Sequence, residues 1–362
     1  MNNRERIVAT AFCKKTDRAP MILYLCAWDE TMYKWETEEE YPQGADLAVE
    51  TGYDPGIKAV DEIKLGLFPE FETEVIEERE HTTIIRNSFG VMEECMKDKS
   101  TIPRGISYPV TCMEDWEQIK HERLNPNSPE RFPANWSEIC NQYNHGEHAV
   151  QIGDFPYGLF GTVRELMGVE GTLLAFYDQP ELIEDMMNYL TDFWLTLYER
   201  AACELNIDCV HIWEDMSGKQ GSLISPNMIQ EFMIPNYQKI KSFAKKQNAF
   251  VMLDTDGNCD MLIPLFIEGG IDLLMPFEVA AGSDVIKYRA KYPNLSMLGG
   301  IDKRELAKGR DAIDCELARI EPLLSENGFF PALDHLIHPE VSYANFKYYT
   351  ERLRELINKH AR

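Results

Sequence analysis

The chain has 362 residues, of which 44% are hydrophobic and 27% are charged, a composition typical of folded globular proteins. Its formal net charge is −25, so phosphate backbones and anionic lipid surfaces repel it. These values exclude disordered and fibrous classes, and they predict a protein that binds neither nucleic acid nor membranes.

Nine cysteines are scattered along the chain, and no two of them form a CxxC pair. An odd number at irregular spacing argues against a disulfide framework and for a reducing compartment. Residues 1–6 carry charges without an apolar h-region, and no window approaches about 18 uninterrupted apolar residues, the length of a membrane span. We therefore expect a cytoplasmic protein with neither a signal peptide nor a transmembrane helix.

The first part of the chain predicts one strand and an insertion. Residues 20–26 form an apolar run that we interpret as the first strand. Residues 70–115 show strand alternation at 82–86 and turn residues such as Asn87 and Gly90, which predict a β-hairpin insertion. Residues 125–144 are rich in Pro and Asn and predict a loop with a short helix.

The rest of the chain repeats one pattern, in which an apolar run is followed by a polar turn and a helical segment. The expected strands lie at 149–154, 208–215, 250–257, 271–278, 295–302 and 328–335. The expected helices lie at 180–200, 225–234, 258–268, 284–291, 303–325 and 340–359. Continuous apolar runs of this length are typical of strands buried on both faces of a parallel sheet.

Six βα units favour either a barrel or a doubly wound sheet. Nearly every expected strand ends in Asp, Glu or His, and a ring of polar strand ends is typical of a barrel, whereas a doubly wound sheet gathers its ligand residues at one switch point. No GxGxxG fingerprint follows the first strand. The expected fold is α/β: one (β/α)₈ TIM barrel domain over residues 1–362, with the hairpin insertion near the barrel mouth.

Asp254 and Asp256 leave the end of a buried strand on the same side, within the sequence DTDGN at 254–258. Carboxylates this close repel each other unless a cation or a raised pKa compensates. Asp256 or Asn258 can instead cap the following helix. His335 ends the last expected strand, and with Asp254 and Asp256 it offers an oxygen and nitrogen ligand set, so these three residues are the predicted metal ligands.

The sequence HIWED at 211–215 is the second polar cluster. Strand alternation separates Glu214 from Asp215, so one of these two predicted catalytic residues is expected to point into the mouth. The other is expected to cap a turn or to pair with Lys219. The residues predicted to bind substrate are Tyr24, Asp154, His211 and Glu278.

Several motifs, in this order and spacing, resemble the uroporphyrinogen decarboxylase superfamily. They are GLFGTVRELMG at 158–168, EDMSG at 214–218, LISP at 223–226, DTDGN at 254–258, GGID at 299–302, and His335 with Pro339 and Asn345. The resemblance covers roughly residues 1–357 and is strongest after residue 150. It implies a (β/α)₈ barrel, often a homodimer, that is either a decarboxylase or a cobamide-dependent methyltransferase.

The first-strand region discriminates between these two activities. Decarboxylases of the family carry an arginine-rich motif there, which holds the carboxylates of the substrate. Residues 25–33 contain Asp29 and Glu30 and no arginine, which disfavours a polycarboxylate substrate. The methyltransferase branch is the closer resemblance, including GYD at 52–54.

In that branch, zinc is held by His-x-Cys at the place of Asp254 and Asp256 and by Cys at the place of His335, so this chain departs at all three positions. The replacements form a harder ligand set, so the resemblance implies a zinc site that polarises a methyl donor and not one that activates a thiol. The hypothesis is a corrinoid-dependent methyltransferase that acts between a small methylated substrate, such as a methoxy compound, and a separate corrinoid protein that carries the cobalamin. Two alternatives stay open: a decarboxylase with an altered substrate, and a non-catalytic barrel that binds a tetrapyrrole or corrinoid.

Overall fold

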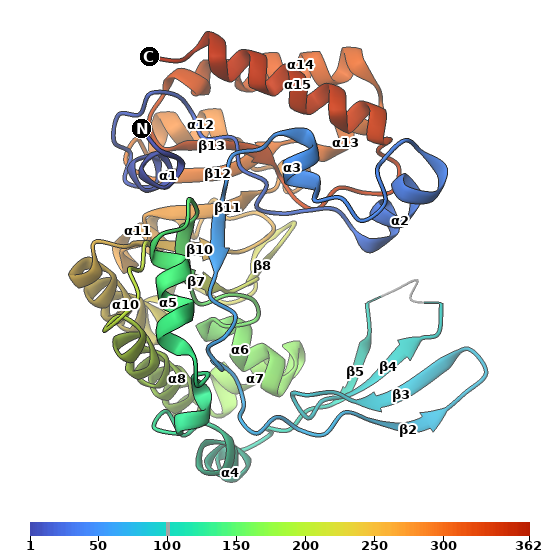
Figure 1. The fold of residues 1–362 in the computed structure, drawn as a ribbon. Coiled ribbons are helices and arrows are strands. Elements are labelled where there is room, and N and C mark those ends of the chain that lie inside the picture. The colour runs from blue at the N-terminus through green and yellow to red at the C-terminus, as the bar shows by residue number, and fades with distance from the viewer. Residues whose placement is uncertain (99–101) are drawn as a thin grey trace.

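The computed structural model describes residues 1–98 and 102–362. Its centre is a parallel sheet of seven strands whose spatial order follows the chain (Figure 1). These strands are β1 (Ile57–Ala59), β6 (Ala149–Ile152), β7 (Cys209–Trp213), β10 (Phe250–Asp254), β11 (Leu273–Phe277), β12 (Ser296–Ile301) and β13 (Phe329–Leu333). Helices connect successive strands from β6 onward, so this is a curled parallel sheet of the TIM-barrel type.

The predicted strands from residue 149 onward are confirmed as β6, β7, β10, β11, β12 and β13. Every residue of these strands is buried except Asp254, at the end of β10. Continuous apolar runs therefore do form strands that are covered on both faces here. The sequence did not indicate β1, which has only three residues.

Residues 21–27 lie between the two edges of the parallel sheet. Beside β1, the Met21 carbonyl accepts a hydrogen bond from the Asp54 amide at 2.8 Å. Beyond β13, Ala27 forms an isolated parallel bridge with Ile337. The predicted first strand at 20–26 is thus wrong as a regular strand, because its backbone bonds to loops at either edge instead of to a continuous ladder.

The helices surround the parallel sheet (Figure 1). They are α1 (Asn3–Ala11), α2 (Asp29–Glu38), α3 (Leu47–Thr51), α4 (Met113–Arg123), α5 (Trp136–Asn144), α6 (Leu159–Met167), α7 (Val169–Asp178), α8 (Pro180–Ala201), α9 (Pro226–Met228), α10 (Ile234–Gln247), α11 (Ile263–Gly269), α12 (Val285–Lys291), α13 (Lys303–Ala307), α14 (Arg310–Ile320) and α15 (Tyr343–Lys359). The helix expected at 303–325 is divided into α13, α14 and a short 3₁₀ turn. The break falls at Gly309, whose φ of +103° is incompatible with a continuous helix.

Helix α1 covers the amino-terminal ends of the strands. Its residues Ile7 and Ala11 belong to the same buried cluster as Phe250 and Phe330, which lie at the start of β10 and β13. The other end of the sheet, where the strands finish, is therefore the end at which a ligand can enter. Among the described residues, no helix combines the length and the apolar character needed to cross a membrane.

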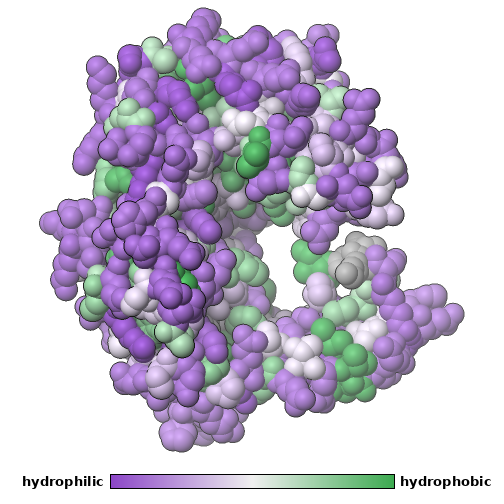
Figure 2. All heavy atoms as spheres, in the orientation of Figure 1, coloured by the Kyte–Doolittle hydropathy of each residue, from purple (hydrophilic) through white to green (hydrophobic). Residues whose placement is uncertain are grey.

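A second sheet projects from the body of the molecule and is antiparallel (Figure 1). Its strands, in spatial order, are β2 (Glu74–Glu78), β3 (Thr82–Arg86), β4 (Met92–Met96) and β5 (Arg104–Ser107). The segment for which the sequence predicted a hairpin thus holds four strands. Figure 2 shows a hollow between this sheet and the rest of the molecule. A two-stranded hairpin, β8 (Ser217–Gly218) and β9 (Gly221–Ser222), follows β7.

Candidate functional site

A cavity of about 290 Å³ lies at the carboxyl side of β6, β7 and β10, and we call it the strand-end pocket. It is lined by Tyr24, Leu25, Ile57, Ala59, Gln151, Asp154, Phe155, His211 and Asp254. Strand alternation explains part of this set, because Ile57 and Ala59 face the pocket while Lys58 between them does not. Its size is at the lower end of the range for ligand pockets, about 300–1,000 Å³. Four predicted site residues, Tyr24, Asp154, His211 and Asp254, therefore meet in one place.

His211 is the most unusual side chain in the strand-end pocket. It is 2% exposed, and neither ring nitrogen has a hydrogen-bond partner among the described residues. Burial lowers the pKa of His211 to about 3, so the imidazole is neutral at physiological pH. Buried polar atoms without a partner are costly. A ligand that hydrogen-bonds to this ring would remove that cost.

Asp254 lies beside His211, with its Oδ2 atom 3.9 Å from the histidine Nε2. This distance is too long for a hydrogen bond, and no other described residue donates one to the Asp254 carboxyl group. Burial, and then the nearby carboxylates of Asp256, Asp215 and Asp154, raise the pKa of Asp254 well above its usual range. This carboxyl group therefore holds its proton up to a higher pH than an exposed aspartate does.

Tyr24 and Gln151 contribute further polar groups to the strand-end pocket, and the Tyr24 ring lies 6.4 Å from the His211 ring. The Tyr24 hydroxyl donates a hydrogen bond to Gln151 Oε1 at 3.0 Å, and Gln151 Nε2 donates to the Gly153 carbonyl at 2.9 Å. Burial raises the pKa of Asp154, which lies 3.5 Å from the same amide nitrogen. The sequence analysis did not identify Gln151. The available signal was a single amide inside an otherwise apolar strand at 149–152.

Asp256 and Glu278 line a second cavity, of about 350 Å³. His335 Nε2 is 3.2 Å from Asp256 Oδ2, and the Gly257 amide donates to Glu278 Oε2 at 3.1 Å. The two aspartates line different cavities, Asp254 the strand-end pocket and Asp256 the second cavity. Asp254 thus faces His211, while Asp256 faces His335.

The three predicted metal ligands are therefore distributed over two polar pairs. Over residues 1–98 and 102–362, no group of three or more His, Cys, Asp or Glu side chains is placed to hold a metal ion. As they are arranged, Asp254, Asp256 and His335 do not fit a three-ligand site, and the zinc hypothesis stays a prediction. Metal analysis of the wild type beside the Asp254→Ala/Asp256→Ala variant tests it, since about one zinc per chain that is lost in the variant would confirm it.

Glu214, one of the two predicted catalytic residues, lies at the amino terminus of α6. Its carboxylate is completely buried and accepts hydrogen bonds from the first amides of α6: Leu159 at 3.1 Å, Phe160 at 2.7 Å and Gly161 at 3.2 Å. The Tyr237 hydroxyl donates a fourth, at 2.7 Å. A carboxylate at a helix amino terminus satisfies otherwise unpaired amides. Glu214 therefore anchors α6 against the end of β7.

Asp215 also lies outside both cavities among the described residues. Its partner is Arg164 of α6, with Nη1 at 2.7 Å from Oδ2, and not Lys219 as the sequence suggested. The same guanidinium donates to the Asp215 carbonyl at 2.9 Å and lies 4.8 Å from the centre of the Trp213 ring. Asp215 has a φ of +40°, which only a few non-glycine residues adopt. The Arg164 contacts hold this strained turn at the rim of the barrel.

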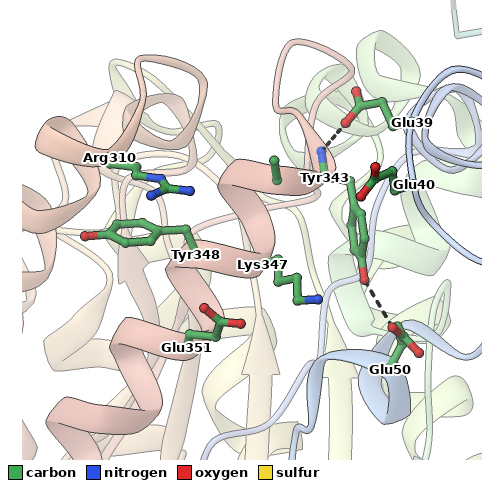
Figure 3. Close-up of a pocket in the computed structure, with 9 residues that line it drawn as sticks. Glu39, Glu40, Glu50, Arg310, Tyr343, Lys347, Tyr348 and Glu351 are labelled. Carbon is green, nitrogen blue, oxygen red and sulfur yellow. Dashed lines mark hydrogen bonds between the residues drawn. The ribbon is translucent and has the colours of Figure 1, made fainter.

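The largest described cavity, about 600 Å³, is elsewhere, between α15 and the segment that contains α3 (Figure 3). Its charged and aromatic side chains come from Glu39, Glu40, Glu50, Arg310, Tyr343, Lys347, Tyr348 and Glu351. Tyr343 is already satisfied there, because its amide donates to Glu39 and its hydroxyl to Glu50. None of the predicted site residues contributes to it, so the strand-end pocket remains the candidate site.

The fold of this chain is similar to that of a solved structure. A methyltransferase from Methanosarcina mazei has a similar structure, with a TM-score of 0.58 and 15% sequence identity over 99% of both chains. At this identity the likeness shows the fold alone. A 3-keto-L-gulonate-6-phosphate decarboxylase from Vibrio cholerae matches with a TM-score of only 0.28 and 14% identity, over 62% of this chain and 78% of the other, and carries no argument. No curated protein matches the chain.

The family assignment comes from the sequence as a whole. The family model described as uroporphyrinogen decarboxylase (URO-D) matches residues 85–356, which is more than half of the chain. This match confirms the resemblance inferred from the motifs at 158–168, 214–226 and 254–258. The chain belongs to the uroporphyrinogen decarboxylase (URO-D) family.

Proposed function

We propose that this protein is a methyltransferase that moves a methyl group between a small methylated substrate and a corrinoid carried by a separate protein. The observation that carries the proposal is the strand-end pocket. It is small, it presents the unpaired polar groups of His211 and Asp254, and its lining contains no lysine or arginine. The overall fold shared with the Methanosarcina mazei methyltransferase is consistent with this proposal.

The charges of the pocket argue against decarboxylation of a porphyrinogen. Such a substrate carries several carboxylates, which proteins hold with arginine or lysine side chains. The lining of the strand-end pocket offers Asp154 and Asp254 instead, and residues 25–33 contain no arginine. A polycarboxylate would therefore meet like charges and no partner.

The substrate would bind through its polar group and present its methyl group to the open end of the barrel. His211 and Asp254 would hydrogen-bond to the polar group, while the hydrogen bond between Tyr24 and Gln151 holds these two side chains in place. Where the donor is neutral, Asp254 would supply the proton for the leaving atom. We assign this role to Asp254 because Glu214 and Asp215, the residues predicted for it, are engaged with α6.

The corrinoid supplies a nucleophilic cobalt that takes up the methyl group. The partner protein would dock at the carboxyl ends of the strands, because α1 closes the opposite end of the sheet. The zinc site and the homodimer implied by the family resemblance stay predictions, and no step of the proposal depends on them.

The test is methyl transfer from a panel of small methylated donors to free cob(I)alamin, followed by the absorbance change of the corrinoid. Asp254→Asn and His211→Asn are expected to lower the rate about 100-fold or more, the usual effect of losing a group that handles a proton or a hydrogen bond in the reaction. The control is Asp178→Asn, since Asp178 is an exposed carboxylate at the end of α7. Decarboxylation of a porphyrinogen, or equal rates in the pocket variants and the control, would refute the proposal.

A further inference from the structure

The charges and unpaired polar atoms of the strand-end pocket indicate which methylated compound it accepts. We propose that the pocket selects a small organic cation, a methylated ammonium compound, in preference to a neutral ether or a carboxylate. This inference rests on the proposed function, because it names the substrate class of that site.

The lining of the pocket carries acidic groups without any compensating base. Asp154 and Asp254 are its ionisable side chains apart from Tyr24 and the neutral His211, and no lysine or arginine lines it. Lys58, the nearest lysine in sequence, lies on the other face of β1, with its ammonium group 5.1 Å from the Tyr143 ring. A ligand with a positive charge would therefore complement these carboxyl groups, whereas an anion would be repelled.

The surroundings of the pocket do not reverse this charge. The groups that act electrostatically on Asp254 are three further carboxylates, Asp256, Asp215 and Asp154. Arg164 is occupied, because its guanidinium pairs with Asp215 at 2.7 Å. A bound cation would therefore meet an acidic environment around Asp254.

His211 gives independent evidence that the pocket is built for a ligand. The side chain is 98% buried, both ring nitrogens lack a partner among the described residues, and it lines the pocket beside Asp254. A neutral imidazole both donates and accepts a hydrogen bond. It can therefore bond to a hydroxyl group on the substrate while the carboxyl groups face the charged nitrogen.

The remaining walls suit the methyl groups of an ammonium ion. Leu25, Ile57 and Ala59 provide apolar contacts, and Tyr24 and Phe155 provide aromatic rings. Aromatic rings attract cations, and cages of aromatic and acidic side chains are a recurrent means of binding quaternary ammonium groups. Phe155 is 64% exposed and packs edge-to-face on Trp213, so its ring lies at the entrance of the pocket.

Methyl transfer from a methylated ammonium compound to the corrinoid also balances in atoms and electrons. The electron pair of the breaking carbon–nitrogen bond stays on nitrogen, which leaves as a neutral amine. The methyl carbon forms its new bond with the electron pair of the reduced cobalt of the corrinoid. For a quaternary donor, no proton has to be supplied.

Binding of matched probes to the wild-type protein tests the inference directly. Isothermal titration calorimetry would compare choline with dimethylbutanol, its neutral carbon isostere, and with dimethylbutanoate, the corresponding anion, all in the presence of EDTA. We expect choline to bind at least about tenfold more tightly than the neutral isostere, and the anion to show no binding. Equal or tighter binding of the neutral isostere would overturn the inference.

Charge-neutral variants locate the effect in the pocket. Asp254→Asn and Asp154→Asn should weaken choline binding at least about tenfold and leave the neutral isostere unchanged, whereas Asp178→Asn should change neither. Loss of binding of both probes, or of neither, would count against the inference. The comparison of probes on the wild type stands even if a variant fails to fold.

Two further experiments distinguish this inference from a divalent cation site and from a pocket for a neutral methyl donor. Zn²⁺ or Mg²⁺ that binds in the absence of EDTA and displaces choline would show that the pocket is a divalent cation site, and would overturn the inference. Methyl transfer to cob(I)alamin from a neutral methoxy donor, without any from choline, would refute the inference and leave the proposed function intact. Tight choline binding without transfer from any donor would refute the proposed function and support the cation specificity.

Discussion

The substitution Glu214→Gln tests whether this carboxylate anchors α6 or takes part in the reaction. In the folded protein one oxygen accepts from the Leu159 amide and the Tyr237 hydroxyl, and the other accepts from the Phe160 and Gly161 amides. Glutamine retains one acceptor oxygen, but its NH₂ group would face donors. The substitution therefore leaves buried donors unpaired in the core between α6 and β7.

The expected cost follows from the burial of these donors. A buried donor without a partner costs about 1–3 kcal/mol, so the loss at one of the two carboxylate oxygens should lower the free energy of unfolding by roughly 3 kcal/mol. The exposed carboxylate of Glu231 provides the matched control, because Glu231→Gln removes the same charge where no buried group depends on it. That variant should stay within about 0.5 kcal/mol of the wild type.

Urea denaturation at pH 7, followed by circular dichroism, measures the free energy of unfolding of both variants. Titration of the folded variants with choline measures ligand binding in the strand-end pocket. The anchoring role predicts lower stability, with ligand binding retained by the molecules that remain folded. If Glu214→Gln is as stable as the wild type but inactive in methyl transfer, our interpretation is wrong, and Glu214 has the catalytic role that the sequence suggested.

Two further predictions concern stability and the pocket wall. Gly161→Ala should destabilise by about 1–3 kcal/mol, because the added Cβ would lie 2.4 Å from the Trp213 carbonyl oxygen, whereas Gly218→Ala meets nothing within 4 Å and should be neutral. Equal thermal stability of these two glycine variants would refute the close approach of α6 to β7. Tyr24→Phe removes the hydroxyl that donates a hydrogen bond to Gln151 at 3.0 Å. The variant should raise the KM for the methyl donor up to about tenfold with little change in kcat. A large fall in kcat would contradict this prediction.

The sequence alone determined most of the parallel sheet. The strands β6, β7 and β10 to β13 were predictable because each is a continuous apolar run followed by a polar turn, and only burial on both faces favours such runs. It also determined the family, since the motifs at 158–168 and 254–258 occur in a fixed order. Two elements were not predictable from the sequence. Strand β1 has only three residues, too few to show a pattern, and residues 21–27 form backbone hydrogen bonds to loops instead of to a continuous strand.

The sequence also identified several residues of the candidate site, but not their partners. Tyr24, Asp154, His211 and Asp254 were marked by their positions at or near strand ends, and all four line the strand-end pocket. Gln151 was missed because an amide within a strand carries no signal of the direction in which it points. Local spacing placed Asp254 and Asp256 on one side, whereas they face different cavities.

Only the tertiary structure decided which polar groups meet. Asp254 faces His211 because β7 and β10 pair in register, with Met252 opposite His211 and Asp254 opposite Trp213. Glu214 does not line the strand-end pocket, because its carboxylate accepts hydrogen bonds from the first three amides of α6, which begins beside the end of β7. The types of residue and their positions along each strand are local properties that a sequence specifies directly. The distances between residues on different strands depend on register, on turns and on the approach of a helix, and these are fixed only when the whole chain has folded.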